Sequence, residues 1–287
     1  MTVSETPADG ARPASASRAP DAFAGSGVAT IDGAPPLLQL RAINKSFGSV
    51  QVLKDVDLDI PAGKVTALVG DNGAGKSTLI KAVSGIGEPD TGEIRWKGQP
   101  VTIKSAKEAT ALGIATVYQD LALCDNLDIV QNIYLGRELL HFRLLDEAAM
   151  ETGARRALDQ LSVVTVHSVR QLVGSLSGGQ RQAVAVAKAV MGNAELVIMD
   201  EPTAALGVSQ TRLVLELISQ LAARGVAVIV ISHNLVDVFA VADRIAVLYL
   251  GQIAAAGPVE QFDTQTTVEL ITTGTLSSGL EINDLRH

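Results

Sequence analysis

Nine consecutive residues, Gly70 to Thr78, have the composition and spacing of a phosphate-binding loop. Its glycines let successive backbone N–H groups turn inward on one anion. Lys76 adds a positive charge, and the Ser77 hydroxyl is an oxygen ligand of the kind that Mg²⁺ accepts. The candidates for nucleotide binding in this loop are Gly70, Asp71, Asn72, Gly73, Ala74, Gly75, Lys76, Ser77 and Thr78.

The segments on both sides of the loop favour this interpretation. Residues 64–69 form an apolar, β-branched run after a Pro-Ala-Gly turn signal, which predicts a strand. Residues 78–83 carry apolar side chains at helical spacing, so a helix should start at the loop and add its dipole to the anion site. A glycine-rich turn that binds nothing is the alternative, and the strand and helix make it the weaker one.

A second group of residues has the pattern of an anion site without a lysine. Ser177, Gly178, Gly179 and Gln180 come directly before residues 181–190, whose apolar positions predict a helix. A serine and paired glycines at a helix start can bind an anion through backbone N–H groups. Considered alone, the same residues could equally be an ordinary helix cap.

Two carboxylates and a histidine follow two apolar runs that we interpret as buried strands. Residues 195–199 lead to Asp200, placed to complete a Mg²⁺ shell directly or through water, and to Glu201, which could accept a proton from an attacking water. Residues 226–231 lead to His233, at the strand end where parallel sheets bind ligands. A charged strand terminus and a structural histidine are the respective alternatives.

Two more candidates lie in the predicted β-rich parts of the chain. Strands are predicted at 37–43 and 50–60, and Phe47 lies in the turn between them, where its ring could stack on adenine or could simply pack. Gln119 follows a predicted strand at 114–118. Glycine turns predict hairpins at 93–101 and 245–256, whereas residues 139–161 have the pattern of one amphipathic helix.

Composition narrows the class of protein. The 287 residues carry a formal net charge of -8, which argues against an electrostatic nucleic-acid binder. The single cysteine excludes an internal disulfide and fits a reducing compartment.

Residues 1–36, rich in Ala, Pro and Ser, are predicted to be a disordered tail, and they lack the pattern of a secretory signal. No apolar run approaches the roughly 18 residues needed to span a bilayer, so any membrane role is expected to come through a partner.

The order of these motifs along residues 37–258 resembles the nucleotide-binding subunit of an ABC transporter. The sequence Leu176-Ser177-Gly178-Gly179-Gln180, between a Walker A and a Walker B motif, separates this family from kinases and GTPases. The resemblance implies an α/β P-loop NTPase fold of ABC type: a RecA-like core, an N-terminal antiparallel β subdomain and an inserted α-helical subdomain at about 120–192. Residues 259–287 would form a C-terminal helix and tail.

The resemblance also implies roles for the candidates, within a head-to-tail dimer that holds two ATP molecules. The loop at Lys76 and Ser77 would hold one ATP with Mg²⁺, and Ser177 to Gln180 of the opposite subunit would cap its γ-phosphate. Phe47 would stack on adenine. Gln119 would sense Mg²⁺ and the water while linking the site to the membrane subunit. Glu201 would polarise the water, and His233 would contact the γ-phosphate.

Finer details, among them Val117 to Leu123 and Glu201 to Gly207, are similar to bacterial monosaccharide importers of the ribose/xylose/fructose type. Such a subunit would lie on the cytoplasmic face of the inner membrane, attached through transmembrane permease subunits that receive sugar from a periplasmic or extracellular binding protein. A transporter ATPase for another cargo (amino acid, lipid or exported compound) and a soluble ABC ATPase outside transport are the alternatives.

Three departures from the family pattern affect these expectations. Gly207 stands where many ABC ATPases have the Asp of the D-loop, and Phe47 replaces the commoner Tyr. Only one Walker A motif is present, although monosaccharide-type relatives usually fuse two ATPase halves, so we expect a homodimer or pairing with a separate ATPase chain. The segment after Pro258 is too short for the regulatory β-barrel of disaccharide-type importers.

Overall fold

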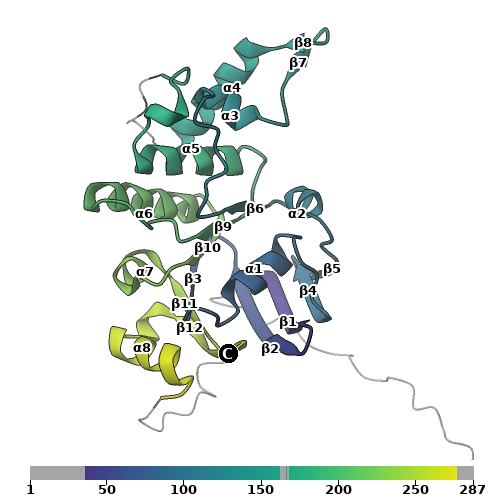
Figure 1. Ribbon diagram of the computed structural model, residues 1–287, viewed down its shortest axis with the longest axis vertical. Coiled ribbons are helices and arrows are strands. Elements are labelled where there is room, and N and C mark those ends of the chain that lie inside the picture. Colours follow the sequence, from purple (N-terminus) through teal and green to yellow (C-terminus); the bar gives the residue numbers. More distant parts are fainter. Residues whose placement is uncertain (1–35, 162–165, 167, 277–287) are drawn as a thin grey trace, which may run out of the picture.

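The computed structural model describes residues 36–161, 166 and 168–276 (Figure 1). The tail predicted for residues 1–36 lies outside the described residues, apart from Pro36, which is the first residue of a strand. The last residues of the predicted C-terminal tail, 277–287, are likewise outside them.

A four-stranded antiparallel sheet forms the N-terminal part, in the order β2-β1-β4-β5. Alternating apolar residues turn one face of this sheet inward, and Trp96 is buried there, as expected of a sheet-packing residue. Its strands are β1 (Pro36–Phe47), β2 (Val50–Pro61), β4 (Thr91–Trp96) and β5 (Gln99–Val101).

A six-stranded sheet in the order β12-β11-β3-β10-β9-β6 forms the centre of the molecule. Neighbouring strands are parallel except at the β11–β12 edge hairpin, which was predicted at 245–256. The central strands are continuous apolar runs because helices and the first sheet cover both faces. The strands are β3 (Val65–Val69), β6 (Ile114–Val117), β9 (Leu196–Asp200), β10 (Ala227–Ile231), β11 (Arg244–Tyr249) and β12 (Gln252–Pro258).

Helices surround the central sheet, and several begin at capping residues. Asp128, Ser177 and Asp263 each accept a backbone N–H three residues ahead, which fixes the starts of α3, α5 and α8. The helices are α1 (Lys76–Val83), α2 (Ala106–Leu112), α3 (Ile129–Tyr134), α4 (Glu147–Gln160), α5 (Gly178–Val190), α6 (Val208–Ala223), α7 (Leu235–Val241) and α8 (Thr264–Thr273).

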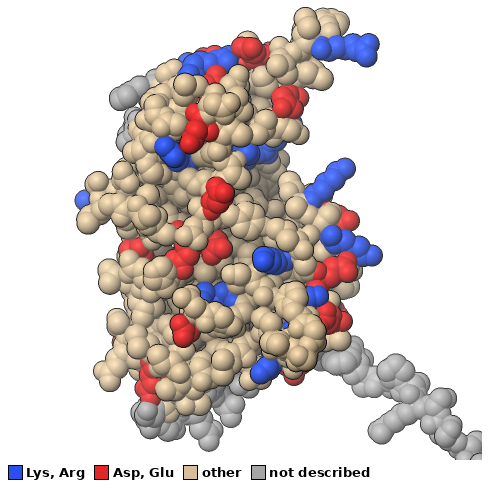
Figure 2. Space-filling model, viewed as in Figure 1, with Lys and Arg blue, Asp and Glu red and all other residues tan. Residues whose placement is uncertain are grey.

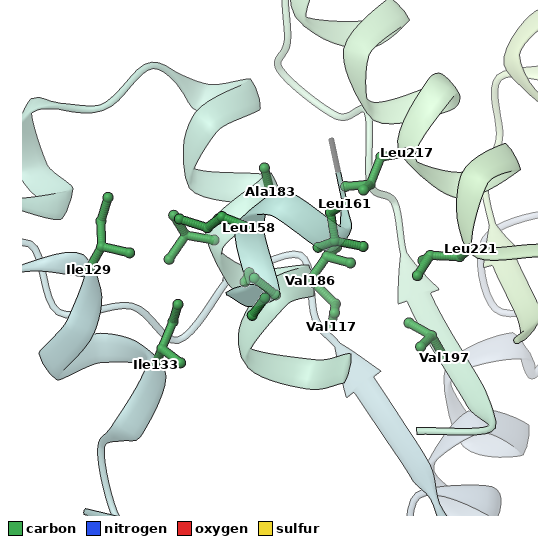
Figure 3. Close-up of a cluster of buried hydrophobic side chains, with 14 of the residues drawn as sticks. Val117, Ile129, Ile133, Leu158, Leu161, Ala183, Val186, Val197, Leu217 and Leu221 are labelled. Carbon is green, nitrogen blue, oxygen red and sulfur yellow. The ribbon is translucent and has the colours of Figure 1, made fainter. Parts of the chain in front are cut away.

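Two of the three apolar clusters among the described residues hold the layers around α1 and the helical region together. Helix α1 places Leu79 and Ile80 between the two sheets, in one cluster with residues of β1, β2, β9 and β10. The other cluster joins α3, α4 and α5 to one face of the central sheet, and it also contains the inner face of α6 (Figure 3). Val186 of α5 and Leu221 of α6 belong to it. The helical region is therefore packed continuously onto the sheet that carries the candidate site.

The prediction of one helix over residues 139–161 is wrong in its first part. Residues 140–145 form a small hairpin of β7 (Leu140–His141) and β8 (Leu144–Leu145), and α4 starts only after Asp146, whose side chain caps it. Phe142 and Arg143 have φ of 49° and 71° and reverse the chain between the strands. The hairpin lies at one end of the molecule (Figure 1), and the Phe142 side chain is 87% exposed.

Within the described residues, none of the helices combines the length and hydropathy needed to cross a bilayer. Lys and Arg side chains are interspersed with Asp and Glu over the face shown in Figure 2.

Candidate functional site

Four strands of the central sheet end at the same edge, and each one leads directly to predicted site residues. The phosphate-loop candidates follow β3, Glu201 follows β9, His233 follows β10 and Gln119 follows β6. These strands are parallel and form the neighbouring series β3-β10-β9-β6. Motifs far apart in the sequence are therefore collected at the carboxyl edge of one sheet, where such folds bind ligands.

The loop from Gly70 to Gly75 turns back on itself and ends in the first turn of α1. Lys76 Nζ donates hydrogen bonds to the carbonyl oxygens of Gly70 and Asp71, at 2.7 and 2.9 Å. Ser77 lies in the same first turn, with an exposed side chain. The loop therefore presents backbone, ammonium and hydroxyl groups at one helix N-terminus, as the sequence predicts for a phosphate site.

The loop needs glycine at position 75 for two independent reasons. Gly75 has φ of 108°, in the left-handed region that side chains disfavour. A Cβ there would lie 2.9 Å from Leu53 Cδ2 and 3.0 Å from the Val52 carbonyl oxygen. Strand β2 therefore lies directly against the loop. The β11–β12 turn also holds it, because Gly251 N donates to the Ala74 carbonyl oxygen at 2.9 Å.

Charges of both signs are concentrated between the loop and the end of β9. Burial lowers the pKa of Lys76, and the negative charges of Glu201, Asp71 and Asp200 oppose that shift. Burial first, and then the charge of Glu201, raises the pKa of Asp200, while Lys76 acts in the opposite direction. Two neighbouring carboxylates thus share one ammonium group, an arrangement that additional positive charge would stabilise.

Glu201 and His233 are in direct contact. His233 Nδ1 lies 2.9 Å from Glu201 Oε2, and the Glu201 side chain is 18% exposed whereas that of His233 is 75% exposed. The backbone of Glu201 is fixed by its N–H, which donates to the Ile231 carbonyl oxygen at 2.9 Å. The pair therefore has one largely shielded carboxylate and one imidazole open to the outside.

Phe47 is not a core residue. It ends β1 and is 58% exposed, and Lys45 Nζ lies 5.7 Å from its ring centroid, within the range of a cation–π contact. Gln119 is likewise exposed, just after β6. Adenine stacking by Phe47 and the sensing role of Gln119 stay predictions.

The motif Ser177 to Gln180 caps α5 as the sequence indicates. The Ser177 side chain accepts from Gln180 N, and Gln180 Oε1 accepts from Ser177 N. A Cβ on Gly178 would meet Leu206 Cδ2 at 2.6 Å, and one on Gly179 would meet Gln210, so the glycines let α5 approach α6 closely. In Figure 1 the start of α5 lies apart from α1, which follows the phosphate loop. Contact of this motif with a nucleotide stays a prediction.

Sequence reasoning gave no role to Thr203 or Asp237, although they join the loop after β9 to the first turn of α7. Thr203 Oγ1 donates to Asp237 Oδ2 at 2.7 Å. The two residues are distant in sequence and belong to no local motif, so no sequence signal pairs them. Contact of Val52 and Leu53 with the loop was missed for the same reason.

Comparison with known proteins finds sequence relatives over most of this chain. The fructose import ATP-binding protein FrcA of Rhizobium meliloti is 50% identical over 224 residues, covering 76% of this chain and 86% of FrcA. The xylose/arabinose import ATP-binding protein XylG of Sulfolobus acidocaldarius is 45% identical over 236 residues, covering 82% of this chain and 94% of XylG.

Solved structures of ATP-binding cassettes have a similar fold. The crystal structure of a nucleotide-free ATP-binding cassette from an ABC transporter superposes with a TM-score of 0.71 at 26% identity, covering 86% of this chain and 98% of that one. The sequence profile described as ABC transporter matches residues 53–204, which include the phosphate loop, the capped start of α5 and the carboxylates after β9. The chain therefore belongs to the ABC transporter family of ATP-binding proteins, with the P-loop ABC fold and the ATPase class of that family.

Proposed function

We propose that this chain is the ATP-hydrolysing subunit that powers a bacterial importer of a monosaccharide of the ribose/xylose/fructose class. The observation that supports ATP hydrolysis is the Glu201–His233 pair at the carboxyl edge of the sheet. The charge of Glu201 also interacts with that of Lys76. The sugar class is supported by relatives named for the import of fructose and of xylose and arabinose.

The phosphate loop and the exposed aromatic ring support the mode of ATP binding. Backbone N–H groups of residues 70–75 and the Lys76 ammonium would bind the β- and γ-phosphates. The Phe47 ring, exposed at the end of β1 and already in contact with a cation, would stack on adenine. Binding of the phosphate charge would also stabilise Lys76 in its ammonium form.

The residues at the site fit Mg²⁺ bound together with ATP. Ser77 and Asp200 offer hard oxygen ligands, and Gln119 offers an amide oxygen near the same edge of the sheet. Burial and the charge of Glu201 raise the pKa of Asp200, and a bound cation would offset both effects. Bound Mg²⁺ would supply charge neutralisation on the phosphate oxygens.

In hydrolysis, Glu201 would orient the attacking water and accept its proton. His233 would hold the Glu201 carboxylate through Nδ1 and contact the γ-phosphate. The contribution of the chain would otherwise be positioning and electrostatic stabilisation, as in phosphoryl transfer generally. Hydrolysis by this pair does not require any residue to form a covalent intermediate.

A second ATPase subunit would cap the γ-phosphate through its Ser177 to Gln180. We propose a head-to-tail homodimer, or a pair with a separate ATPase chain, docked on permease subunits at the cytoplasmic face of the inner membrane. The exposed side chains of Leu140, Phe142 and Leu144 in the β7–β8 hairpin are candidates for part of the permease contact. A sugar-binding protein would act at the opposite side of the membrane.

Purification of the tagged full-length protein from membranes of its own host tests this proposal. We expect a polytopic permease and a sugar-binding protein to co-purify, and their identity would define the cargo. Recovery of a permease that belongs to an amino-acid, lipid or export system would contradict the sugar assignment alone. Recovery of ribosomal or repair proteins without a permease would contradict the transport function and leave the ATPase chemistry standing.

A further inference from the structure

A partly buried hydrogen bond joins the loop after β9 to the first turn of α7. Thr203 Oγ1 donates to Asp237 Oδ2 at 2.7 Å, and Asp237 is 8% exposed. A buried carboxylate is costly unless it is satisfied by hydrogen bonds, so this pairing has a strong geometric preference. The loop in question begins with Glu201, and α7 begins just after His233.

The bond forms a second side-chain link, in addition to the backbone bond from Glu201 N to the Ile231 carbonyl oxygen, between the segments that already meet at the catalytic pair. Glu201 and His233 are in contact at 2.9 Å, and Thr203 and Asp237 lie a few residues further along the same two segments. Two side-chain contacts fix the orientation of one segment against the other, whereas one contact alone would allow the segments to rotate about it. The Thr203–Asp237 bond therefore restricts the direction in which Glu201 presents its carboxylate.

The backbone of this loop needs such a restraint. Glu201 and Ala205 have φ of 50° and 59°, in the left-handed region that non-glycine residues adopt at a cost. Residues in such conformations keep them only where surrounding contacts fix the chain. The contacts that fix this loop include the N–H of Glu201, bonded to Ile231, and the hydroxyl of Thr203, bonded to Asp237.

The local structure of α7 leaves Asp237 available for this purpose. At the third position of a helix, an acidic side chain often accepts the N–H of the capping residue. Here the N–H of the cap, Asn234, donates instead to Ser232 Oγ at 3.0 Å, and Asn234 caps the N–H of Val236. Asp237 can therefore direct Oδ2 to Thr203.

We propose that Asp237 and Thr203 are positioning residues for ATP hydrolysis, which act by holding Glu201 in the orientation that it needs to activate water. This inference rests on the proposed ATP-hydrolysing function and adds two residues to its machinery. Neither residue touches the nucleotide in this account. Their removal should lower kcat while ATP binding is preserved.

A matched pair of substitutions at one position tests the proposal in the full-length protein. T203V removes the hydroxyl and keeps the shape of the side chain, whereas T203S keeps the hydroxyl. We expect T203V to lower kcat about tenfold, which is the effect of roughly 1.4 kcal/mol in the barrier, with KM for ATP within about twofold of wild type. T203S should retain at least about half of the wild-type kcat, because a serine hydroxyl can make the same bond to Asp237.

D237A provides an independent second variant, since it removes both carboxylate oxygens and with them the acceptor of the Thr203 hydroxyl. Its kcat should fall like that of T203V, and the T203V/D237A double variant should be no slower than either single variant, because all three lose one shared bond. In an E201Q background, T203V should leave the residual turnover unchanged within about twofold, since the bond acts through Glu201. A contact with a merely structural role would not depend on Glu201 in this way.

Each contrary outcome has a distinct meaning. Wild-type kcat in both T203V and D237A, or equal loss in T203S and T203V, would overturn the positioning role. So would a tenfold loss from T203V that persists in the E201Q background. Absence of ATP hydrolysis by the wild-type protein would instead contradict the proposed function on which the inference rests.

Discussion

His233 Nδ1 lies 2.9 Å from Glu201 Oε2, although the two residues belong to different motifs. The contact follows from the sheet, because β9 and β10 are adjacent and parallel, with Ile231 directly beside Asp200. Glu201 is the first residue after β9 and His233 is the second residue after β10, so both leave the sheet at the same edge, side by side. This register places an imidazole next to the carboxylate proposed to activate water.

Removing the imidazole should leave the carboxylate without its side-chain partner. We expect H233A to lower kcat for ATP hydrolysis by about a hundredfold, in the range found when one group of a hydrogen-bonded catalytic pair is lost. Nucleotide affinity should change less than about threefold. Steady-state kinetics, together with equilibrium titration of a fluorescent ATP analogue, would measure both, and unchanged kcat would exclude His233 from the hydrolytic step.

Lys76 should be required for nucleotide binding itself. Its Nζ lies within the loop, bonded to the carbonyl oxygens of Gly70 and Asp71, at the position where a phosphate would meet it. K76A should weaken ATP binding at least about tenfold, the loss expected of one charge-assisted phosphate contact. K81A, which changes an exposed lysine on the same helix, is the control and should bind normally. Equal affinity of the two variants would exclude the proposed phosphate site.

Crowding around Gly75 predicts a specific effect of one added methyl group. G75A combines a φ of 108° with a Cβ at 3.0 Å from the Val52 carbonyl oxygen. We expect it to lose about 2 kcal/mol or more of unfolding free energy, and ATP affinity as well. G98A is the matched control: Gly98 has φ of 77° but nothing within 4 Å of a Cβ, so its cost should be about 1 kcal/mol. Equal costs would contradict the close packing of β2 on the loop.

The raised pKa of Asp200 predicts how its removal changes stability with pH. Burial and the charge of Glu201 make the folded protein hold this proton more tightly than the unfolded chain does. Ionised Asp200 therefore destabilises the folded state, and the penalty is largest above the raised pKa. In EDTA without nucleotide at pH 8, D200N should increase Tm by on the order of 2 °C. The gain should shrink as pH falls towards the ordinary aspartate pKa of about 3.9.

Adding ATP and Mg²⁺ should reverse this ranking, because only the wild-type carboxylate would gain a cation. Differential scanning fluorimetry measures both conditions, with D159N, on the exposed face of α4, as the control. A Tm of D200N below that of wild type in EDTA would contradict the electrostatic description of the site.

Local patterns were sufficient for much of this molecule. Glycine spacing located the phosphate loop, and apolar runs located β3, β9 and β10 within a residue or two. Once these strands are parallel neighbours, Lys76, Glu201 and His233 must come to one edge. Their proximity is therefore a consequence of the fold class, which the motif order already indicates.

Other features depend on contacts between distant segments, which a single sequence does not encode visibly. The apolar residues at 139–145 fit a helical period, but the left-handed φ values of Phe142 and Arg143 make a hairpin instead. Thr203 and Asp237 come together only because α7 packs beside the loop after β9. Neither relationship has a signature in residue spacing.

Steady-state ATP hydrolysis by E201Q, measured beside wild type, tests the central claim most directly. The substitution keeps the size of the side chain and its contact with His233 but removes the base. We expect turnover to fall by two orders of magnitude or more, with ATP binding intact and an ATP-dependent dimer accumulating in size-exclusion chromatography. Turnover by E201Q at the wild-type rate would contradict the assignment of Glu201 and, with it, this account of the site.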